Sequence, residues 1–263
     1  MKTIGIVHLS DIHIPDKQGD LWDGVDPCIK LEKLIELAKK LELNPSFTVI
    51  TGDISHTGTI QSYNLAKKYI NKIHSLGGPV LPTMGNSDNM ENFRKVLLEK
   101  PSPQKEASCD YSQTIEGLHV IVMDSHTPDS DTGSFSEEQL DWLERELSEH
   151  ADEPAIIAFH APIFFFGEGG VFDKVDAMRF RDIVSEGNVL AVLNGHLHFP
   201  LFTMFDGVHY VQAGSPVFEN SYNEKGRLSH DSSSFNLLGY NERRLLVRPI
   251  SFSEGTQLIE RTP

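Results

Sequence analysis

The sequence has 263 residues and a formal net charge of −15, because 38 acidic residues outnumber 23 basic ones. This balance argues against long nucleic acids as partners, since their binding relies on Lys and Arg that neutralise phosphates. No apolar run approaches the roughly 20 residues of a membrane span, so we expect no membrane insertion. A chain of this length suits one large domain with a sizeable core.

The two cysteines and the start of the chain indicate the compartment. Cys28 and Cys109 lie far apart and match no zinc or redox spacing. The first apolar run begins at Ile4 and is interrupted by His8, which makes it too short for a signal peptide. We therefore expect reduced, structural thiols and a cytoplasmic protein.

Short apolar runs alternate with helical patterns through most of the chain. The runs predict buried strands at residues 3–10, 47–51, 79–83, 118–124, 155–159 and 189–194. Between them, a period of 3.6 residues predicts helices around 31–41 and 65–73. Ser136, with Gln139 three residues later, indicates a capping box at the start of another helix. This alternation is typical of βαβ units, in which ligands bind at the carboxyl ends of parallel strands.

After about residue 200 the pattern changes to strands alone. The runs at 209–214, 234–240 and 243–252 predict strands, the last two joined by a turn. We expect both ends of the chain to belong to one sandwich of two sheets. The whole chain, 1–263, then forms a single domain with a core over about 1–215 and C-terminal strands and a tail over about 216–263.

Five predicted strands end in potential metal ligands. In chain order these are Asp11 and His13, Asp53, Asn86, His160, and the pair His196 and His198. Each residue has an ordinary alternative, such as a turn cap or a satisfied core histidine. Burying all of them together would be costly without a cation.

The ligand types indicate which cations fit. Nitrogen and oxygen ligands without thiolate suit divalent Mn, Fe, Zn or Co, and seven ligands exceed what one tetrahedral ion needs. Two divalent ions bridged by one carboxylate match the count. The spacing of Asp11 and His13 would point both side chains the same way if the strand geometry continued through them.

The order D-x-H, G-D, G-N-x-D, H, G-H-x-H resembles the calcineurin-like metallophosphoesterase superfamily, and within it the class III cyclic nucleotide phosphodiesterases. The resemblance runs from HLSDIHI through TGDISHTG, MGNSD, GSFSEEQLDWLERELSE and FHAPI to NGHLH and DGVHYVQAGSP. It implies an α/β (α+β) fold, a four-layer αββα sandwich with two mixed β-sheets flanked by helices. Pairing of two subunits into a homodimer, as in similar enzymes, is a further possibility.

The resemblance also implies a ligand scheme. It assigns Asp11, His13 and His198 to one ion and Asn86, His160 and His196 to the other, with Asp53 bridging them. A hydroxide shared by two cations is acidic enough to form near neutral pH, so in-line attack on phosphorus is the expected reaction. We expect the substrate to lie against Asn86, Ser87 and His196.

Asp88 and Ser87 raise separate questions. Asp88 is expected either to orient a neighbouring imidazole without binding a metal itself, or to cap the helix that starts near Asn89. The two roles are compatible. Many relatives have a histidine where this chain has Ser87, and that histidine resembles a general acid. Because a hydroxyl is a poor acid, either another group donates the proton, or the substrate has a good leaving group, or turnover is slow.

Three histidines are candidates for the missing proton donor: His56, His126 and His209. His56 is preferred because its loop leaves the same edge of the sheet as Asp53, the alternative being a solvent-exposed loop residue. The run from Phe164 to Phe166 follows a candidate ligand and is expected either to pack in the core or to cover an apolar part of the substrate.

The leading functional hypothesis is hydrolysis of a small phosphodiester, a 3',5'- or 2',3'-cyclic nucleotide. The alternatives with the same site are hydrolysis of a glycerophosphodiester, a phosphomonoester or a nucleotide pyrophosphate. A non-catalytic, protein-binding scaffold is the third hypothesis, and it predicts damaged ligand positions, whereas all seven matched positions are intact. The sequence does not fix the native metals or the oligomeric state.

Overall fold

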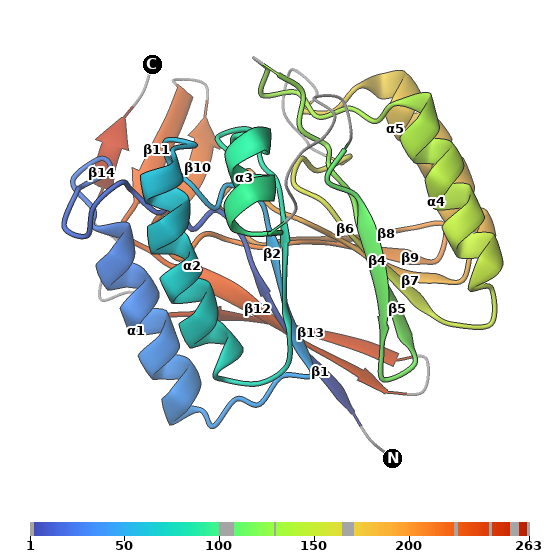
Figure 1. Cartoon of the computed structure of the whole chain (residues 1–263), viewed down its shortest axis with the longest axis horizontal. Helices are drawn as coiled ribbons and strands as arrows, with labels where there is room; N and C mark the ends of the chain where they lie inside the picture. Colours follow the sequence, from blue (N-terminus) through green and yellow to red (C-terminus); the bar gives the residue numbers. More distant parts are fainter. Residues whose placement is uncertain are drawn as a thin grey trace.

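Two mixed β-sheets face each other at the centre of the protein, and helices cover their outer faces (Figure 1). The computed structural model describes residues 3–99, 108–128, 130–164, 171–223, 226–241, 244–252 and 258–261. Apolar side chains from both sheets, such as Ile6, Val49, Val120 and Leu193, form the layer between them. The expected four-layer αββα sandwich is therefore confirmed.

The first sheet has five strands in the order β13-β12-β1-β2-β3. Its strands are β1 (Ile4–Leu9), β2 (Phe47–Thr51), β3 (Val80–Thr83), β12 (Ser234–Asn241) and β13 (Arg244–Ser251). β1, β2 and β3 are parallel to one another, and β12 pairs antiparallel with β1. The C-terminal strands thus complete the sheet that the N-terminus begins, as expected.

The second sheet has six strands in the order β4-β5-β6-β7-β9-β8. Its strands are β4 (Tyr111–Ile115), β5 (Leu118–Val122), β6 (Ala155–Ala158), β7 (Val189–Asn194), β8 (Leu201–Phe205) and β9 (Val208–Gln212). β5, β6, β7 and β9 are parallel, and β4 and β8 are antiparallel edge strands. The parallel strands in each sheet bring several carboxyl ends to one edge.

Helices cover each sheet on the side away from the other sheet. α1 (Pro27–Lys40), α2 (Ile60–His74) and α3 (Met90–Val96) pack on the first sheet, and α4 (Glu137–Glu149) and α5 (Lys174–Glu186) pack on the second. Asp26 caps α1, and the Ser136 capping box opens α4 as expected. The helix expected near Asn89 is α3, with Asn89 itself as its N-cap.

The structure adds elements that the sequence pattern did not indicate, among them the edge strands β4 and β8. The sequence pattern did not predict α5, because its exposed apolar residues Val175 and Met178 weaken the 3.6-residue period that marks a buried helix face. A small antiparallel sheet also forms from β10 (Glu219–Asn223), β11 (Gly226–His230) and β14 (Leu258–Arg261), in the order β10-β11-β14.

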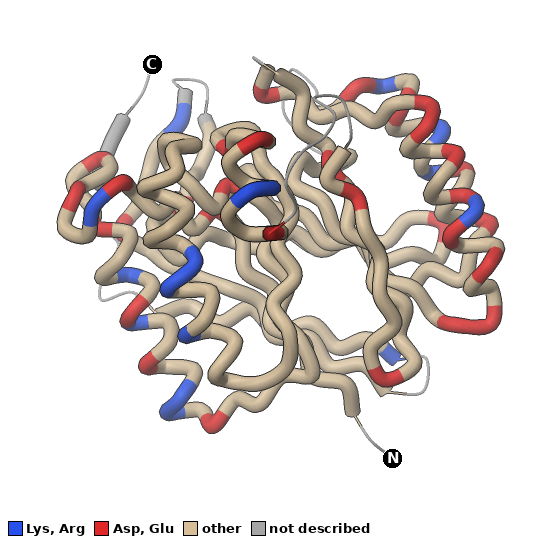
Figure 2. Tube along the Cα trace, viewed as in Figure 1, with Lys and Arg blue, Asp and Glu red and all other residues tan. Residues whose placement is uncertain are grey.

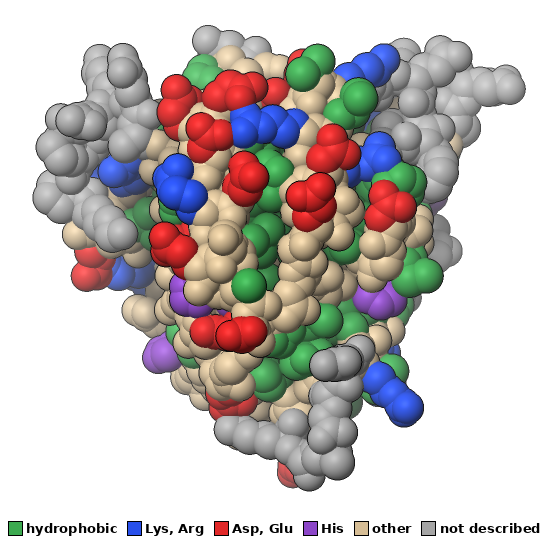
Figure 3. Space-filling view, turned by 90° about the vertical axis from the view of Figure 1, so that its right-hand side faces the viewer, with side chains coloured by type: hydrophobic (Ala, Val, Ile, Leu, Met, Phe, Trp, Pro, Cys, Tyr) green, Lys and Arg blue, Asp and Glu red, His purple; other side chains and the backbone are tan. Residues whose placement is uncertain are grey.

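Acidic and basic residues are interspersed along the helices (Figure 2). On the face that carries α4 and α5, acidic side chains are numerous and basic ones lie between them (Figure 3). Among the described residues, no helix combines the length and apolar character needed to cross a bilayer.

Candidate metal centre

Loops that follow β1, β2, β3, β6 and β7 meet at one edge of the sandwich, and the seven candidate ligands come together there. Backbone hydrogen bonds tie the first two loops to each other: Asp11 N donates to Gly52 O (3.0 Å) and His13 N donates to Asp53 O (2.9 Å). The loop after β7 is attached through His196 N, which donates to Asp11 Oδ2 (2.9 Å). Backbone hydrogen bonds therefore tie the loops after β1 and β2 to each other, whereas the loop after β7 is tied to them through the Asp11 carboxylate.

One half of the cluster consists of Asp11, His13 and His198, all of them buried. His13 Nε2 lies 3.3 Å from His198 Nε2, and Asp11 Oδ1 lies 3.4 Å from His198 Nε2 and 4.0 Å from His13 Nε2. Three potential ligand atoms thus converge on one point.

The other half consists of Asn86, His160 and His196. Asn86 Oδ1 lies 2.9 Å from His160 Nε2 and 3.0 Å from His196 Nδ1, and the two imidazole nitrogens are 3.2 Å apart. His160 Nδ1 lies 2.7 Å from Thr51 O, and a carbonyl can only accept, so Nδ1 carries the proton. This tautomer leaves the lone pair of Nε2 directed at Asn86.

Asp53 lies between the two halves. Its Oδ2 is 3.4 Å from His13 Nε2 and 3.6 Å from His160 Nε2, while Oδ1 accepts a hydrogen bond from Ser87 N (2.9 Å). The two groups that flank Asp53 are the two sets that the resemblance assigns to separate ions. That assignment stays a prediction, but the position of Asp53 suits a bridging carboxylate.

Five of the seven candidate ligands have a positive φ angle. The residues are Asp11 (53°), His13 (40°), Asp53 (50°), His196 (77°) and His198 (60°). Non-glycine residues rarely adopt this left-handed conformation, and such strain concentrates at functional sites. It also shows that strand geometry does not continue through Asp11 and His13. The condition under which their i, i+2 spacing would align them is not met, because β1 ends at Leu9, and the loop after β1 brings the two side chains together instead.

Two motif glycines are required by close packing at this edge. A Cβ on Gly85 would lie 2.3 Å from both the backbone nitrogen and Oδ1 of Asp53. A Cβ on Gly195 would lie 1.7 Å from Ser10 Oγ and 2.8 Å from Asp11 Oδ2. The Gly-Asn and Gly-His motifs therefore allow the loops to approach the carboxylates closely.

The donor set fits divalent cations. Pairs of imidazole nitrogens face each other at 3.2–3.3 Å beside buried carboxylates, and in such pairs only a shared proton or a cation avoids repulsion between lone pairs. The set of histidine nitrogens, carboxylates and one amide oxygen contains no thiolate, which suits Mn, Fe, Zn or Co. Among the described residues, Cys28 and Cys109 are both unbonded thiols, and neither belongs to the candidate metal groups.

The electrostatic environment favours the neutral, metal-binding form of His13 and His196 and disfavours the ionised form of Asp53. Burial lowers the pKa of His13 well below its usual value, and the neighbouring His198 lowers it further. Burial and His160 lower the pKa of His196 to about 4. Burial and the charge of Asp11 raise the pKa of Asp53 to about 6. Neutral imidazoles are the metal-binding form, and a cation beside Asp53 removes the repulsion between the two carboxylates.

Asp88 plays neither of the roles expected from the sequence. Its two carboxylate oxygens accept hydrogen bonds from three backbone N–H groups and one hydroxyl, at 2.8–3.1 Å: Ile54 N, Ser55 N, Gly85 N and Tyr63 Oη. Asn89, not Asp88, caps α3, and no imidazole of the described residues hydrogen-bonds Asp88. Asp88 instead joins the loop after β2 to the loop after β3, and so fixes the distance between Asp53 and Asn86.

Ser87 is held by two hydrogen bonds at the same place. Its backbone N–H donates to Asp53, and its Oγ donates to Ser55 O at 2.7 Å. The hydroxyl proton is thus committed to a carbonyl. This geometry agrees with the expectation that Ser87 does not act as a general acid.

The three candidate proton donors lie in different places. His56 is half-buried and its ring is 5.8 Å from the ring of His13. Burial lowers the pKa of His56, opposed by Asp16, which makes its protonated form a stronger but scarcer donor near neutral pH. His209 is the second residue of β9 and lies beside Ala191, near the amino end of β7, whereas His196 follows the carboxyl end of β7, so the candidacy of His209 was wrong.

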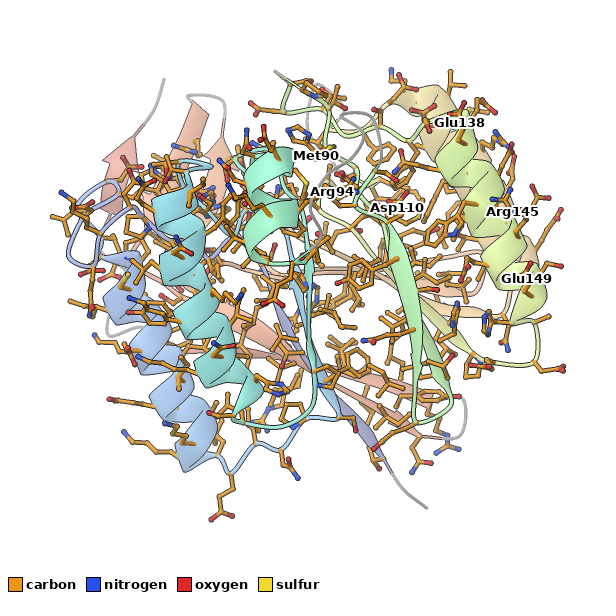
Figure 4. The ribbon with its side chains drawn as sticks, viewed as in Figure 1. Met90, Arg94, Asp110, Glu138, Arg145 and Glu149 are labelled. Carbon is orange, nitrogen blue, oxygen red and sulfur yellow. The ribbon has the colours of Figure 1, made fainter. Side chains whose placement is uncertain are left out.

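His126 lines a cavity of about 700 Å³ between α3 and α4. Met90 marks the α3 side of this cavity in Figure 4, Asp110 lies between the helices, and Glu138 marks the α4 side. The ring contacts found at the metal centre among the described residues include the ring of His56. This contact favours His56 among the three histidines.

Two further residues, Trp22 and Asp131, contact candidate ligands of the metal centre. Trp22, which the sequence reasoning missed, packs its indole on the rings of His13 (4.0 Å between centroids) and His56 (4.6 Å). Asp131 accepts a hydrogen bond from Asn86 Nδ2 (3.0 Å), which directs Asn86 Oδ1 at the imidazoles. Phe164 is partly buried and packs on Phe205 and Tyr210, which favours the core alternative for it. Residues 165 and 166 lie outside the described part of the chain.

Comparison with known proteins agrees with this geometry. A family model described as calcineurin-like phosphoesterase matches residues 4–200. A probable cyclic nucleotide phosphodiesterase of Rhodococcus erythropolis is 30% identical over 83% of this chain and 72% of its own length. A cAMP/cGMP dual specificity phosphodiesterase of Mycobacterium tuberculosis is 30% identical over 77% of this chain and 64% of its own length.

Two other proteins widen the comparison. A probable glycerophosphodiester phosphodiesterase of Arcobacter nitrofigilis is 29% identical over 80% of this chain and 78% of its own length. The crystal structure of a dimetal phosphatase from Danio rerio has a TM-score of 0.65 over 96% of this chain and 99% of that chain, at 12% identity. The structural likeness supports the fold, and the sequence likeness supports the family.

Proposed function

Because this chain belongs to the calcineurin-like phosphoesterase family and is a metal-dependent hydrolase of phosphoric esters, we propose that its substrate is a cyclic nucleotide. The observation that carries the proposal is the convergence of seven potential ligands with Asp53 between two groups. Relatives named as cyclic nucleotide phosphodiesterases support the choice of substrate.

In this proposal the two groups of side chains hold two divalent ions. Asp11, His13 and His198 hold one ion, Asn86, His160 and His196 hold the other, and Asp53 contacts both. When bound, such ions activate water near neutral pH and neutralise charge on the phosphoryl oxygens.

The residues around the ions have distinct tasks. Asp88 holds the Asp53 and Asn86 loops at a fixed separation through its backbone contacts. Thr51 O fixes the tautomer of His160, and Asp131 fixes the amide orientation of Asn86. These contacts orient the ligands before a substrate arrives. A site held in its productive geometry in advance increases the rate of the catalysed reaction.

We further propose that His56 donates the proton to the leaving oxygen. Ser87 Oγ is committed to Ser55 O, and His56 is the candidate whose ring touches the centre. General acid catalysis is worth about 10² to 10⁴ in rate. His56→Gln should therefore slow hydrolysis of an alkyl diester by about 10² or more, and slow an aryl diester much less.

His209→Gln is the matched control for this variant, because His209 lies beside Ala191, near the amino end of β7. The control should turn over both diesters like the unmodified protein. An equal loss on alkyl and aryl diesters in His56→Gln would exclude His56 as the donor.

The substrate class is tested with Mn²⁺-loaded protein on a panel of esters. We expect kcat/KM to be higher for 3',5'- or 2',3'-cyclic AMP than for a glycerophosphodiester or an aryl phosphomonoester, and Asp53→Asn should lose activity on all of them. A glycerophosphodiesterase is the second candidate because one relative carries that name. Preference for glycerophosphocholine would replace the cyclic nucleotide with that substrate and leave the metal site intact.

A further inference from the structure

Trp22 lies on a short, stiff hairpin beside the metal centre. Trp22 and Val25 exchange both backbone hydrogen bonds, at 2.8 and 2.9 Å. The two residues between them, Asp23 and Gly24, have φ angles of 48° and 79°. Positive φ at both central positions is the signature of a type I′ turn, for which Asp-Gly is a preferred sequence. The following residue, Asp26, caps α1, so the Val25 end of the hairpin is anchored to the helix.

The indole of Trp22 packs against four rings. Its centroid lies 4.0 Å from that of His13, 4.5 Å from Phe218, 4.6 Å from His56 and 5.8 Å from His198. Phe218 packs on His198 in turn, at 4.9 Å. The indole therefore contacts two of the three side chains in one half of the metal centre.

His13 differs from two other candidate histidine ligands in how its ring is held. A backbone carbonyl lies at hydrogen-bond distance from the non-ligand nitrogen of His160 (Thr51 O, 2.7 Å) and of His198 (Phe218 O, 3.3 Å). His13 Nδ1 is buried and has no hydrogen-bond partner among the described residues. Metal-binding histidines almost always use such a bond to fix the ring orientation.

We propose that Trp22 is a positioning residue that orients the His13 imidazole by ring packing, in place of the missing hydrogen bond. The nearest ring contact of His13 is with Trp22, and the hairpin fixes the indole. This inference rests on the proposed metal site. It predicts that the ion held by Asp11, His13 and His198 depends on Trp22, whereas the ion on the Asn86 side does not.

Metal affinity tests the proposal directly. Loss of a partner that orients a ligand typically weakens metal binding about 10- to 100-fold. The protein is first freed of metal, and it then competes with a chromophoric chelator for added Mn²⁺. This titration should show two Mn²⁺ sites in the unmodified protein. In Trp22→Ala one of the two should weaken by about that factor, and in Trp22→Phe, which keeps a ring at this place, the loss should be smaller.

Trp142→Ala is the matched control, since it removes the other tryptophan of the chain, on α4 beside the separate cavity. Both Mn²⁺ affinities should stay unchanged in it. If Trp22→Ala and Trp22→Phe keep both affinities while His13→Ala loses one, Trp22 has no positioning role and the metal site stands. If the unmodified protein takes up no Mn²⁺, the proposed metal site itself fails.

Fluorescence gives a second readout that does not depend on activity. Trp142→Phe leaves Trp22 as the only tryptophan. Its emission should be quenched when Co²⁺ binds, because the indole packs on a ligand of the ion. Emission that stays unchanged while Co²⁺ binds at two sites would contradict the proposal.

Discussion

Gly195→Ala tests how tightly the loop after β7 packs on the loop after β1. The added Cβ would lie 1.7 Å from Ser10 Oγ, 2.7 Å from Ser10 Cβ and 2.8 Å from Asp11 Oδ2, whereas carbon atoms in contact are ordinarily about 3.5–4.0 Å apart. The φ angle of Gly195 is not among the positive ones, so the expected penalty comes from the clash and not from the backbone.

The expected loss of stability depends on Ser10, the residue that the added Cβ would displace. Ser10 is fully buried, and its Oγ donates to Thr51 O at 2.8 Å. Overpacking a dense interior costs about 1–3 kcal/mol, and losing this buried hydrogen bond adds about 1 kcal/mol. We therefore expect Gly195→Ala to lower the free energy of unfolding by roughly 2–4 kcal/mol.

Urea denaturation in the presence of EDTA measures this loss without a contribution from bound metal. Gly5→Ala is the matched control, because its Cβ would meet only an atom 3.9 Å away and should change stability by less than about 0.5 kcal/mol. Ser10→Gly makes room, so the double variant should be more stable than the sum of the two single changes predicts. A Gly195→Ala protein as stable as Gly5→Ala, or strict additivity, would refute the reasoning.

The remaining predictions concern the neighbouring loops. Ser87→His should raise turnover of an alkyl diester more than that of an aryl diester, and an equal effect on both would show that proton donation is not limiting. Asp131→Ala should weaken binding of one ion and lower kcat, because Asn86 loses the acceptor that orients its amide, while Asp131→Asn keeps an acceptor and should lose less; equal ion binding in all three proteins would contradict this. Burial raises the pKa of Asp124 to about 7, so the folded state disfavours its ionised form and stability falls as pH rises from about 4 to 7. Relative to the unmodified protein, Asp124→Asn should therefore gain up to roughly 4 kcal/mol between pH 4 and 8 in urea denaturation, and a difference independent of pH would contradict the shift.

The strands and the residues at their carboxyl ends could be predicted because buried parallel strands leave a strong signal. The continuous apolar runs at 47–51 and 189–194 have the same bounds as β2 and β7 in the structure. Parallel topology then brings their ends together, which is why Asp53 and His196 were expected at one edge.

The features that sequence reasoning missed depend on contacts between distant segments. β4 (Tyr111–Ile115) is only partly buried and polar in sequence, so it lacks the apolar signal of its neighbours. Trp22 lies on a hairpin whose Asp-Gly turn is visible in the sequence, but nothing in that turn indicates that its partners are His13 and His56. Asp88 has a motif position that suggests metal chemistry, while its contacts are with the backbone.

Asp11 and His13 converge by a route that their spacing does not indicate. Spacing along a strand predicts direction only while strand geometry continues, and both residues have left-handed backbone conformations. The loops, not the strand, turn the ligands inward. Left-handed conformations of non-glycine residues leave no sequence signal comparable to an apolar run.

Anomalous diffraction from crystals soaked with Mn²⁺ tests the central claim most directly, because it locates each ion by its own scattering. Two peaks about 3.5–4 Å apart are predicted, one beside His13 and His198, the other beside Asn86 and His160, with Asp53 contacting both. In crystals of Asp53→Asn at least one peak should weaken. A single peak, or none at this edge of the sandwich, would contradict a dinuclear metal centre.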